Sequence, residues 1–350
     1  MRFTIEQNIF FCAKWSIISL LLVVIAGGVV RATGSGMGCP DWPKCFDCYI
    51  PPTNVTQLPT NYQEKYVSKR INKNKRLVRL LESIGYPTLA YQVKNDTSIL
   101  LPEVFNPYKT WCEYVNRILG VIAGLFMLST LLFSCFYFKY NKSVFLLASF
   151  NLILVLLQAW IGSVVVSTNL MPWMITIHMV LALALLAVAI LIYFILSKSF
   201  CSVPSDVRLP VLMLIICLLI TVYQIVIGTH VREEVDAVAT HFKYLPRVNW
   251  LAKVGYSYVL HRVFALLVLL SAVWLYLRAE RFQFGIIRNY VCWNFRLIFL
   301  QLMVGLFLAS NALPPVLQIL HLLIACVLFC VQFYLLLFSI GMYRLNSQNS

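Results

Sequence analysis

The sequence predicts an all-α integral membrane protein in which eight transmembrane helices form two pseudo-symmetric four-helix bundles. Three observations support this fold class: the composition, eight long apolar stretches and an internal repeat. Of the 350 residues, 61% are hydrophobic and 12% are charged, whereas a soluble domain carries about 25% charged residues. An apolar excess of this size requires lipid as the solvent for much of the chain.

Each apolar stretch is long enough to cross a bilayer, for which a helix needs about 17–25 residues. We expect the first four helices to form an N-terminal bundle in residues 1–200, with a long extracytoplasmic loop over 34–112. The other four are expected to form a C-terminal bundle in residues 201–350. The helices are expected near residues 14–33, 114–138, 143–166, 172–197, 209–230, 255–279, 289–309 and 314–340.

The charges between the helices predict the topology. Positive residues are enriched in cytoplasmic loops. They follow the second, fourth and sixth helices and lie near both termini: Lys139, Lys142, Lys198, Arg208, Arg278, Arg281, Arg288, Arg2 and Arg344. We therefore expect cytoplasmic N- and C-termini. The first apolar run, from Ile17 to Val30, is not followed by a usual cleavage site, so we expect it to be a retained helix. The short segment before it contains Glu6, whereas organelle transit peptides are poor in acidic residues, and this favours a bacterial plasma membrane.

The net charge of +15 does not indicate a nucleic-acid partner. Much of it lies in short loops beside apolar helices, where it sets topology. The remainder is concentrated in the polar segment 38–110, which can be extracytoplasmic because long loops translocate largely regardless of charge. Its basic run is typical of a solvated helix face or a contact with anionic lipid: Lys69, Arg70, Lys73, Lys75, Arg76 and Arg79.

An internal repeat relates the two halves. The first helix ends with GGVVR at residues 27–31 and the fifth with GTHVR at 228–232. Adding 143 to the number of Gln158 gives Gln301, and adding 143 to that of His178 gives His321. Because the copies are offset by four helices, both keep the same orientation in the membrane, so this is a parallel repeat.

Three histidines are candidate metal ligands: His178, His261 and His321. An ionisable group inside a span costs about 2.5–3.5 kcal/mol and is usually functional. A lone histidine could equally be a neutral interhelical contact, but three at repeat-related positions favour a function. Imidazole is a good axial ligand of iron, and facing helices can aim two ligands at one metal. His261 and His321 are therefore predicted to bind one haem iron, and His178 a second.

The first half differs chemically from the second. Asn116 stands where His261 stands, so its haem iron would keep an open position for oxygen or for haem exchange; alternatively, this half only packs. Glu113 lies on the same helix face as Asn116 and Arg117. It could relay protons beside the first haem, or be an exposed carboxylate paired with Arg117. Tyr258 replaces it in the second half, which suggests that one haem reacts while the other transfers electrons.

Four arginines lie at the expected outer helix ends: Arg31, Arg117, Arg232 and Arg262. A guanidinium can bind a carboxylate such as a haem propionate bidentately. The alternative is that these side chains reach the membrane interface as arginines at helix ends often do. His230 and His241 lie in or near the loop over 230–253 and are expected to have surface roles.

Four of the eleven cysteines lie on the outer side: Cys39, Cys45, Cys48 and Cys112. Disulfides are the usual state in an oxidising compartment, and Cys39 with Cys45 is the preferred pair. Transfer of reducing equivalents by this pair, a second bridge between Cys48 and Cys112, and a four-thiol zinc site remain alternatives. The spacing lacks two close cysteine pairs, which disfavours zinc. The other cysteines are interpreted as small apolar residues.

These motifs together resemble the haem A synthase family. The resemblance rests on residues 27–36, the cysteines around PDWP at 40–43, Glu113 ahead of Asn116-Arg117, and the three histidine helices. It implies that the C-terminal bundle holds haem b through His261 and His321. It also implies that the N-terminal bundle binds haem O and oxidises its ring methyl to a formyl group with Glu113, and that Cys39 and Cys45 can form a disulfide. Haem O synthase and cytochrome oxidase assembly are the implied functional partners.

Two features depart from the family pattern: Asn116 replaces a histidine, and the segment 46–110 is longer than in many relatives. Two other functions are therefore considered. A diheme b-type electron-transfer protein needs paired ligands for two permanent haems, which Asn116 disfavours. Haem transporters or chaperones often have Trp-rich outer loops, whereas the eight Trp here are scattered. The sequence leaves the oligomeric state open, including a homo-oligomer.

Overall fold

The computed structural model describes residues 2–102, 104–197, 211–241, 246–279 and 285–348. Eight helices in this part of the chain are long and apolar enough to cross a membrane, so the chain is a multi-pass helical membrane protein, as predicted. They are α1 (Arg2–Ala32), α4 (Pro107–Tyr137), α5 (Lys142–Ser167), α6 (Pro172–Ser197), α7 (Val211–His241), α8 (Tyr256–Ala279), α9 (Gly285–Ser310) and α10 (Pro315–Gln348).

Four of these helices extend well beyond a predicted end. The α1 helix begins at Arg2 rather than near residue 14, and α4 begins at Pro107 rather than near 114. The α7 helix continues to His241 rather than 230, and α10 continues to Gln348 rather than 340. The prediction detected only the apolar part that fits a hydrocarbon core of about 30 Å, and a helix of 31 residues is about 46 Å long. His230 and His241, expected in or near the loop over 230–253, both lie on α7, and both are exposed, as a surface position requires.

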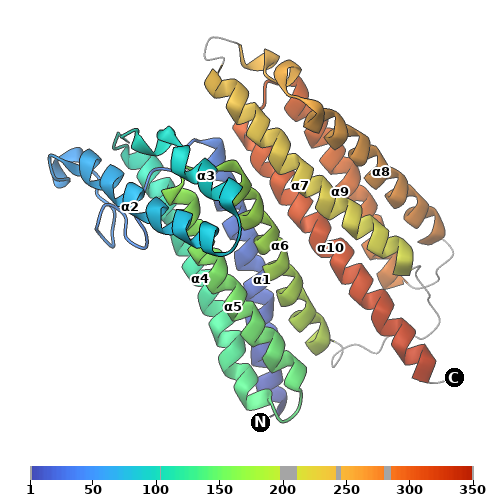
Figure 1. Cartoon of the computed structure of the whole chain (residues 1–350). Coiled ribbons are helices and arrows are strands. Elements are labelled where there is room, and N and C mark those ends of the chain that lie inside the picture. Colours follow the sequence, from blue (N-terminus) through green and yellow to red (C-terminus); the bar gives the residue numbers. More distant parts are fainter. Residues whose placement is uncertain (1, 103, 198–210, 242–245, 280–284, 349–350) are drawn as a thin grey trace.

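The spanning helices pack in two groups of four (Figure 1). In the first group α1 contacts α4 and α6, and α5 contacts α4 and α6; in the second, α7 and α9 each contact α8 and α10. The groups meet where α10 contacts α1 and α6, and where α6 contacts α7. Gly28 of α1 lies at this junction, since a Cβ there would be 3.5 Å from Leu322 of α10. The predicted division at residues 200 and 201 lies outside the described residues, as do Lys198, Arg208 and Arg281.

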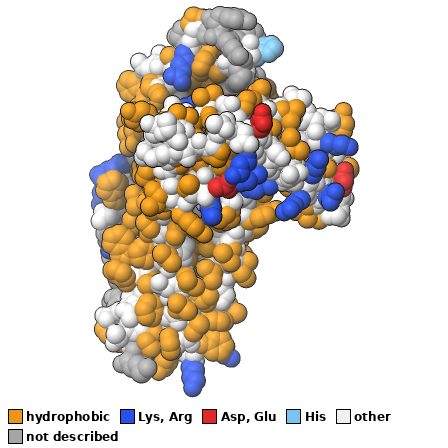
Figure 2. Space-filling model, turned by 90° about the vertical axis from the view of Figure 1, so that its left-hand side faces the viewer, with side chains coloured by type: hydrophobic (Ala, Val, Ile, Leu, Met, Phe, Trp, Pro, Cys, Tyr) orange, Lys and Arg blue, Asp and Glu red, His pale blue; other side chains and the backbone are white. Residues whose placement is uncertain are grey.

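The largest buried apolar cluster fills the junction and includes Leu185, Leu186 and Phe329. Outward-facing positions are also apolar, and Figure 2 shows hydrophobic side chains covering most of the lower body, with Lys and Arg gathered higher up. An apolar exterior is what lipid requires of a spanning helix. Of the cysteines interpreted as apolar, Cys12, Cys217 and Cys326 are buried, Cys135 is exposed, and Cys201 lies outside the described residues.

Residues 33–102 and 104–106, between α1 and α4, form a folded cap. It contains the helices α2 (Tyr62–Ser83) and α3 (Pro87–Asn95) and the short 3₁₀ turns η1 (Val55–Gln57) and η2 (Thr97–Leu100). Two further 3₁₀ turns, η3 (Arg247–Asn249) and η4 (Leu251–Lys253), lie outside the cap and precede α8. The apolar sides of α2 and α3 pack on the ends of α5 and α6. In the basic run, Lys75, Arg76 and Arg79 are exposed as predicted, but Arg70 is buried and donates a 2.7 Å hydrogen bond to the Leu101 carbonyl.

The two turns at the cap end repeat the same backbone. Asn169 and Leu170 between α5 and α6 have φ angles of 52° and 62°, and Ala312 and Leu313 between α9 and α10 have 55° and 56°. Non-glycine residues adopt positive φ rarely, so a pair of them at positions 143 apart is strong local support for the repeat. The pseudo-symmetry of the whole bundles stays a prediction.

Candidate functional site

Two predicted metal ligands meet in the second group of helices. The rings of His261 on α8 and His321 on α10 have centroids 6.3 Å apart and planes inclined by 60°. An imidazole nitrogen lies about 1 Å from its ring centre and metal–imidazole bonds are about 2 Å, so rings that share a metal have centroids about 6 Å apart. The spacing therefore fits one metal ion between the two rings, and the residues present fit a haem iron.

A glycine on the neighbouring helix makes room for each ring. A Cβ on Gly228 of α7 would lie 3.2 Å from Cε1 of His261, and a Cβ on Gly305 of α9 would lie 3.2 Å from Cε1 of His321. Gln224, four residues before Gly228, donates a 2.7 Å hydrogen bond to the His261 carbonyl. A glycine for the ring and a glutamine for the histidine backbone thus hold this side chain in place.

The same unit occurs in the first group. His178 on α6 lies against Gly162 of α5, at 3.4 Å from a Cβ built there, and Gln158 donates a 3.0 Å hydrogen bond to the His178 carbonyl. Sequence reasoning had matched Gln158 with Gln301 but missed Gln224. The detectable signal was a glutamine four residues before a glycine, which these three helices share.

The fourth unit has neither the histidine nor the glutamine of the other three. Gly27 of α1 faces Asn116 of α4, whose Oδ1 would lie 3.9 Å from a Cβ at Gly27. Asn116 stands where the histidine is expected, and Val23 stands four residues before Gly27, where the other helices have glutamine. The histidine and the glutamine that contacts its backbone are thus absent together from this unit.

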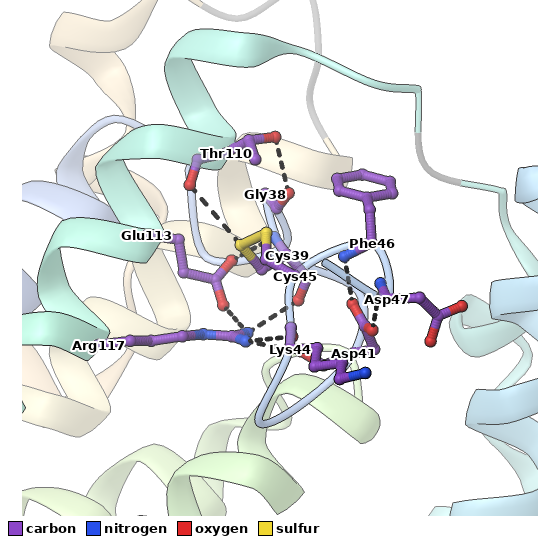
Figure 3. The surroundings of a disulfide bond; sticks show 10 residues. All are labelled: Gly38, Cys39, Asp41, Lys44, Cys45, Phe46, Asp47, Thr110, Glu113 and Arg117. Atoms are coloured by element: carbon purple, nitrogen blue, oxygen red, sulfur yellow. Dashed lines mark hydrogen bonds and ion pairs between the residues drawn. A yellow bond between two sulfur atoms is a disulfide. The ribbon is translucent and has the colours of Figure 1, made fainter. Parts of the chain in front are cut away.

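Glu113 lies against the cysteine loop of the cap (Figure 3). Its carboxylate is only 4% exposed, accepts a 2.7 Å hydrogen bond from the Cys39 N–H and pairs with Arg117. The alternative that Glu113 is an exposed surface carboxylate was therefore wrong in its burial, although the pairing with Arg117 is present. Close docking of the loop requires Gly38, because any Cβ there would collide with the backbone of Lys109.

Arg117 binds the loop backbone as well as Glu113. Its terminal nitrogens donate to the carbonyls of Cys39 at 2.9 Å, Asp41 at 2.6 Å and Lys44 at 3.0 Å. Both terminal nitrogens are thus engaged within the protein, and the contact of Arg117 with a haem propionate stays a prediction.

The other predicted arginines lie elsewhere at the cap end. Arg31 of α1 and Arg232 of α7 both pair with Asp236, at 3.1 Å and 2.9 Å, which joins the two helix groups. Arg232 also donates to Gln318 of α10. Arg262 is exposed, and its guanidinium lies 5.8 Å from the centre of the Tyr258 ring.

The predicted Cys39–Cys45 disulfide is present. Cys48 and Cys112 are free thiols, so the second bridge considered for them is not formed. Across the described ranges there is no group of three or more His, Cys, Asp or Glu side chains that could hold a metal ion by itself. A haem iron takes at most two protein ligands because the porphyrin supplies the others, so His261 and His321 would be enough to hold one.

Fold and site together define a multi-pass helical membrane protein with one histidine pair spaced for a shared metal and a related half in which Asn116 stands at the position of one of those histidines. The family model of cytochrome oxidase assembly protein (COX15-CtaA) matches residues 12–77 and 90–333. The chain belongs to this family.

Three curated relatives bear the name Heme A synthase. The protein of Shewanella oneidensis is 23% identical over 67% of this chain and 60% of its own length. That of Pelagibacter ubique is 29% identical over 60% and 56%, and that of Ehrlichia ruminantium is 27% identical over 91% and 89%. The chain thus spans less than two thirds of the first two relatives and most of the third.

Proposed function

We propose that this chain is a haem A synthase, an oxidoreductase that converts the ring methyl group of haem O to a formyl group. The observation that carries the proposal is the asymmetry between the two halves. The second half pairs His261 with His321 at a spacing for one metal. The first half keeps His178, has Asn116 in the opposite position, and adds the buried Glu113 nearby on the same helix as Asn116.

The second half is the proposed site of haem b. His261 and His321 would hold its iron, and Gly228 and Gly305 let both rings lie close to neighbouring helices. A haem bound here supplies one-electron transfer. The chain's own contribution is orientation, because a ligand ring held by a glycine and by packing keeps its angle to the metal.

The first half is the proposed site of haem O. Oxidation of a methyl group with water as the oxygen source gives a formyl group, four protons and four electrons, so protons must be removed from the site. Glu113 is the candidate proton acceptor. Its contacts with Arg117 and the Cys39 N–H fix the carboxylate at the cap end of α4. His178 is the candidate ligand of the substrate iron.

The proposed function also implies a membrane, a topology and functional partners. We expect a bacterial plasma membrane, cytoplasmic termini and an extracytoplasmic cap; both termini lie at the end of the molecule opposite the cap (Figure 1). Arg31, Arg232 and Arg262, at the cap end, are the candidate contacts of haem propionates. Haem O synthase and cytochrome oxidase assembly are the expected functional partners.

The proposal is tested by haem analysis of a host that makes haem O and expresses this chain. The wild type should yield a formyl-bearing haem, and Glu113→Gln should abolish it while the purified variant retains the haem bound by the second half. Glu6→Gln is the matched control. Glu6 is also a buried carboxylate in the first group of helices, but it lies near the start of α1, and the cap follows the other end of that helix. Normal product from Glu113→Gln would refute the role of Glu113.

Failure of the wild type to make a formyl-bearing haem would refute the function itself. Two permanently bound haems with no product would indicate an electron-transfer protein. Release of unmodified haem to an acceptor would indicate a transporter or chaperone.

A further inference from the structure

We propose that Cys48 is an internal exchange thiol through which an external dithiol reductant reaches the buried Cys39–Cys45 disulfide. Cys39 and Cys45 are 0% and 1% exposed, so a thiol in solution cannot approach either sulfur directly. Cys48 is exposed and free, three residues from Cys45. This inference concerns the disulfide alone and does not depend on the proposed haem chemistry.

The backbone places Cys48 opposite Cys45. Cys45 and Cys48 form an antiparallel bridge, with N–H to carbonyl hydrogen bonds of 2.9 Å and 3.1 Å in the two directions. Phe46 and Asp47 between them have φ angles of 55° and 61°, as in the two-residue type I′ turn of a β-hairpin. Because Cys45 and Cys48 each donate to the other, they form a hydrogen-bonded pair, whose Cα atoms are about 5.5 Å apart and whose side chains lie on one face. A disulfide spans Cα atoms about 4.4–6.8 Å apart and needs Cβ atoms about 3.5–4.5 Å apart, so we infer that the Cys48 thiol reaches the Cys45 sulfur once the two Cβ atoms approach by about 1 Å.

The turn is held by contacts that keep this pairing in place. The buried carboxylate of Asp41 accepts hydrogen bonds from the N–H groups of Phe46 at 2.6 Å and Asp47 at 2.8 Å. Asp47 forms ion pairs with Lys65 at 2.6 Å and Lys69 at 2.5 Å, which fasten the turn to α2. These contacts give residues 46 and 47 a left-handed conformation that non-glycine residues otherwise avoid.

The exchange is a balanced isomerisation. The Cys48 thiolate attacks the Cys45 sulfur, a Cys45–Cys48 bond forms, the Cys39–Cys45 bond breaks, and its electron pair leaves on Cys39, which takes up a proton. An external dithiol then attacks Cys48, releases Cys45 as a thiol and closes its own disulfide through its second sulfur. In sum, the dithiol is oxidised and the Cys39–Cys45 disulfide is reduced to two thiols.

The exchange has a consequence for the neighbouring carboxylate. The Cys39 N–H donates to Glu113, and the Cys39 carbonyl accepts from Arg117. Figure 3 shows that Cys39 makes these contacts while it is tied to Cys45 by the disulfide, so opening the disulfide would free the segment that makes them. The redox state of the cysteine loop is thereby coupled to the position of Glu113.

Trypsin separates the two disulfide isomers. Cleavage after Arg31, Lys44 and Lys65 puts Cys39 on the peptide 32–44 and both Cys45 and Cys48 on the peptide 45–65. After alkylation of the full-length protein in detergent without reductant, the resting isomer gives the two peptides linked, with Cys48 alkylated. The exchanged isomer gives the peptide 32–44 alkylated at Cys39 and the peptide 45–65 closed by its own disulfide.

We expect the exchanged isomer as a minor species in the wild type, and its absence in Cys48→Ser. Reduction of Cys39–Cys45 by dithiothreitol should be slower by about tenfold or more in Cys48→Ser than in the wild type. Cys112→Ser is the matched control, since Cys112 is the other free thiol of the cap end, and it should react as the wild type does. Equal reduction rates in Cys48→Ser and the wild type, or no exchanged isomer in the wild type, would overturn the proposal.

Discussion

Replacement of Gly305 by alanine would displace the ring of His321, one of the two proposed iron ligands of the second half. The added methyl would lie 3.2 Å from Cε1 of His321, whereas carbon atoms in good contact are about 3.5–4.0 Å apart. The ring must therefore give by a few tenths of an ångström. Functional groups need placement to about 0.5 Å, so we expect a displacement of this size to strain or lengthen the bond to the metal. Overpacking of this kind costs about 1–3 kcal/mol.

The assay is the absorption and paramagnetic resonance spectrum of purified protein with haem bound. Gly305→Ala should shift the low-spin signal of a bis-imidazole iron or lower the haem content. Gly120→Ala is the matched control on α4, where a new Cβ would meet no atom within 4 Å, and it should leave the spectrum unchanged. A Gly305→Ala spectrum and haem content identical to those of the wild type would refute the assignment of His321.

Two further predictions concern the cap. Lys65 and Lys69 lower the pKa of Asp47 from 3.8 to about 2. This carboxylate therefore stabilises the fold above pH 3.8 and loses its contribution as the pH falls toward 2. The protection of the amides of residues 45–48 against hydrogen exchange, measured relative to the unfolded chain, should fall over that window in the wild type but not in Asp47→Asn. Leu77→Ala removes a buried side chain between α2 and α5 and should destabilise the cap by about 2–5 kcal/mol, seen as faster proteolysis within α2; an unchanged cleavage rate would contradict that packing.

The membrane-spanning helices could be predicted because the lipid leaves little choice. Only a helix satisfies every backbone hydrogen bond within one segment, so each apolar run of sufficient length had to be helical. The helix ends were harder, since Arg2 and His241 lie in polar sequence where the apolar signal has ended.

The cap could not be predicted as a fold from its charge. Its basic residues dominate the composition, but its position is decided by a few apolar residues, Leu77, Leu81, Ala90 and Val93, which pack on the end of α5. Their helical spacing is visible in the sequence. The surface they cover is formed by another part of the chain, and only the structure shows it.

The sequence indicated which residues belong to the candidate site but not which of them contact one another. Repeat positions identified His178, His261 and His321, because ionisable groups within spans are conspicuous. The contact between Glu113 and the cysteine loop joins residues 74 positions apart, a distance over which no local pattern operates. The hydrogen bonds from the Arg117 guanidinium to the carbonyls of the cysteine loop also join residues far apart in the sequence, so no local pattern predicts them either.

The most direct test compares the iron spectra of purified His261→Ala, His321→Ala and His178→Ala proteins. If the two imidazoles of the second half share one iron, the bis-imidazole low-spin signal should disappear in the first two variants and persist in His178→Ala. Persistence of that signal in His261→Ala and His321→Ala, or its loss only in His178→Ala, would contradict the assignment.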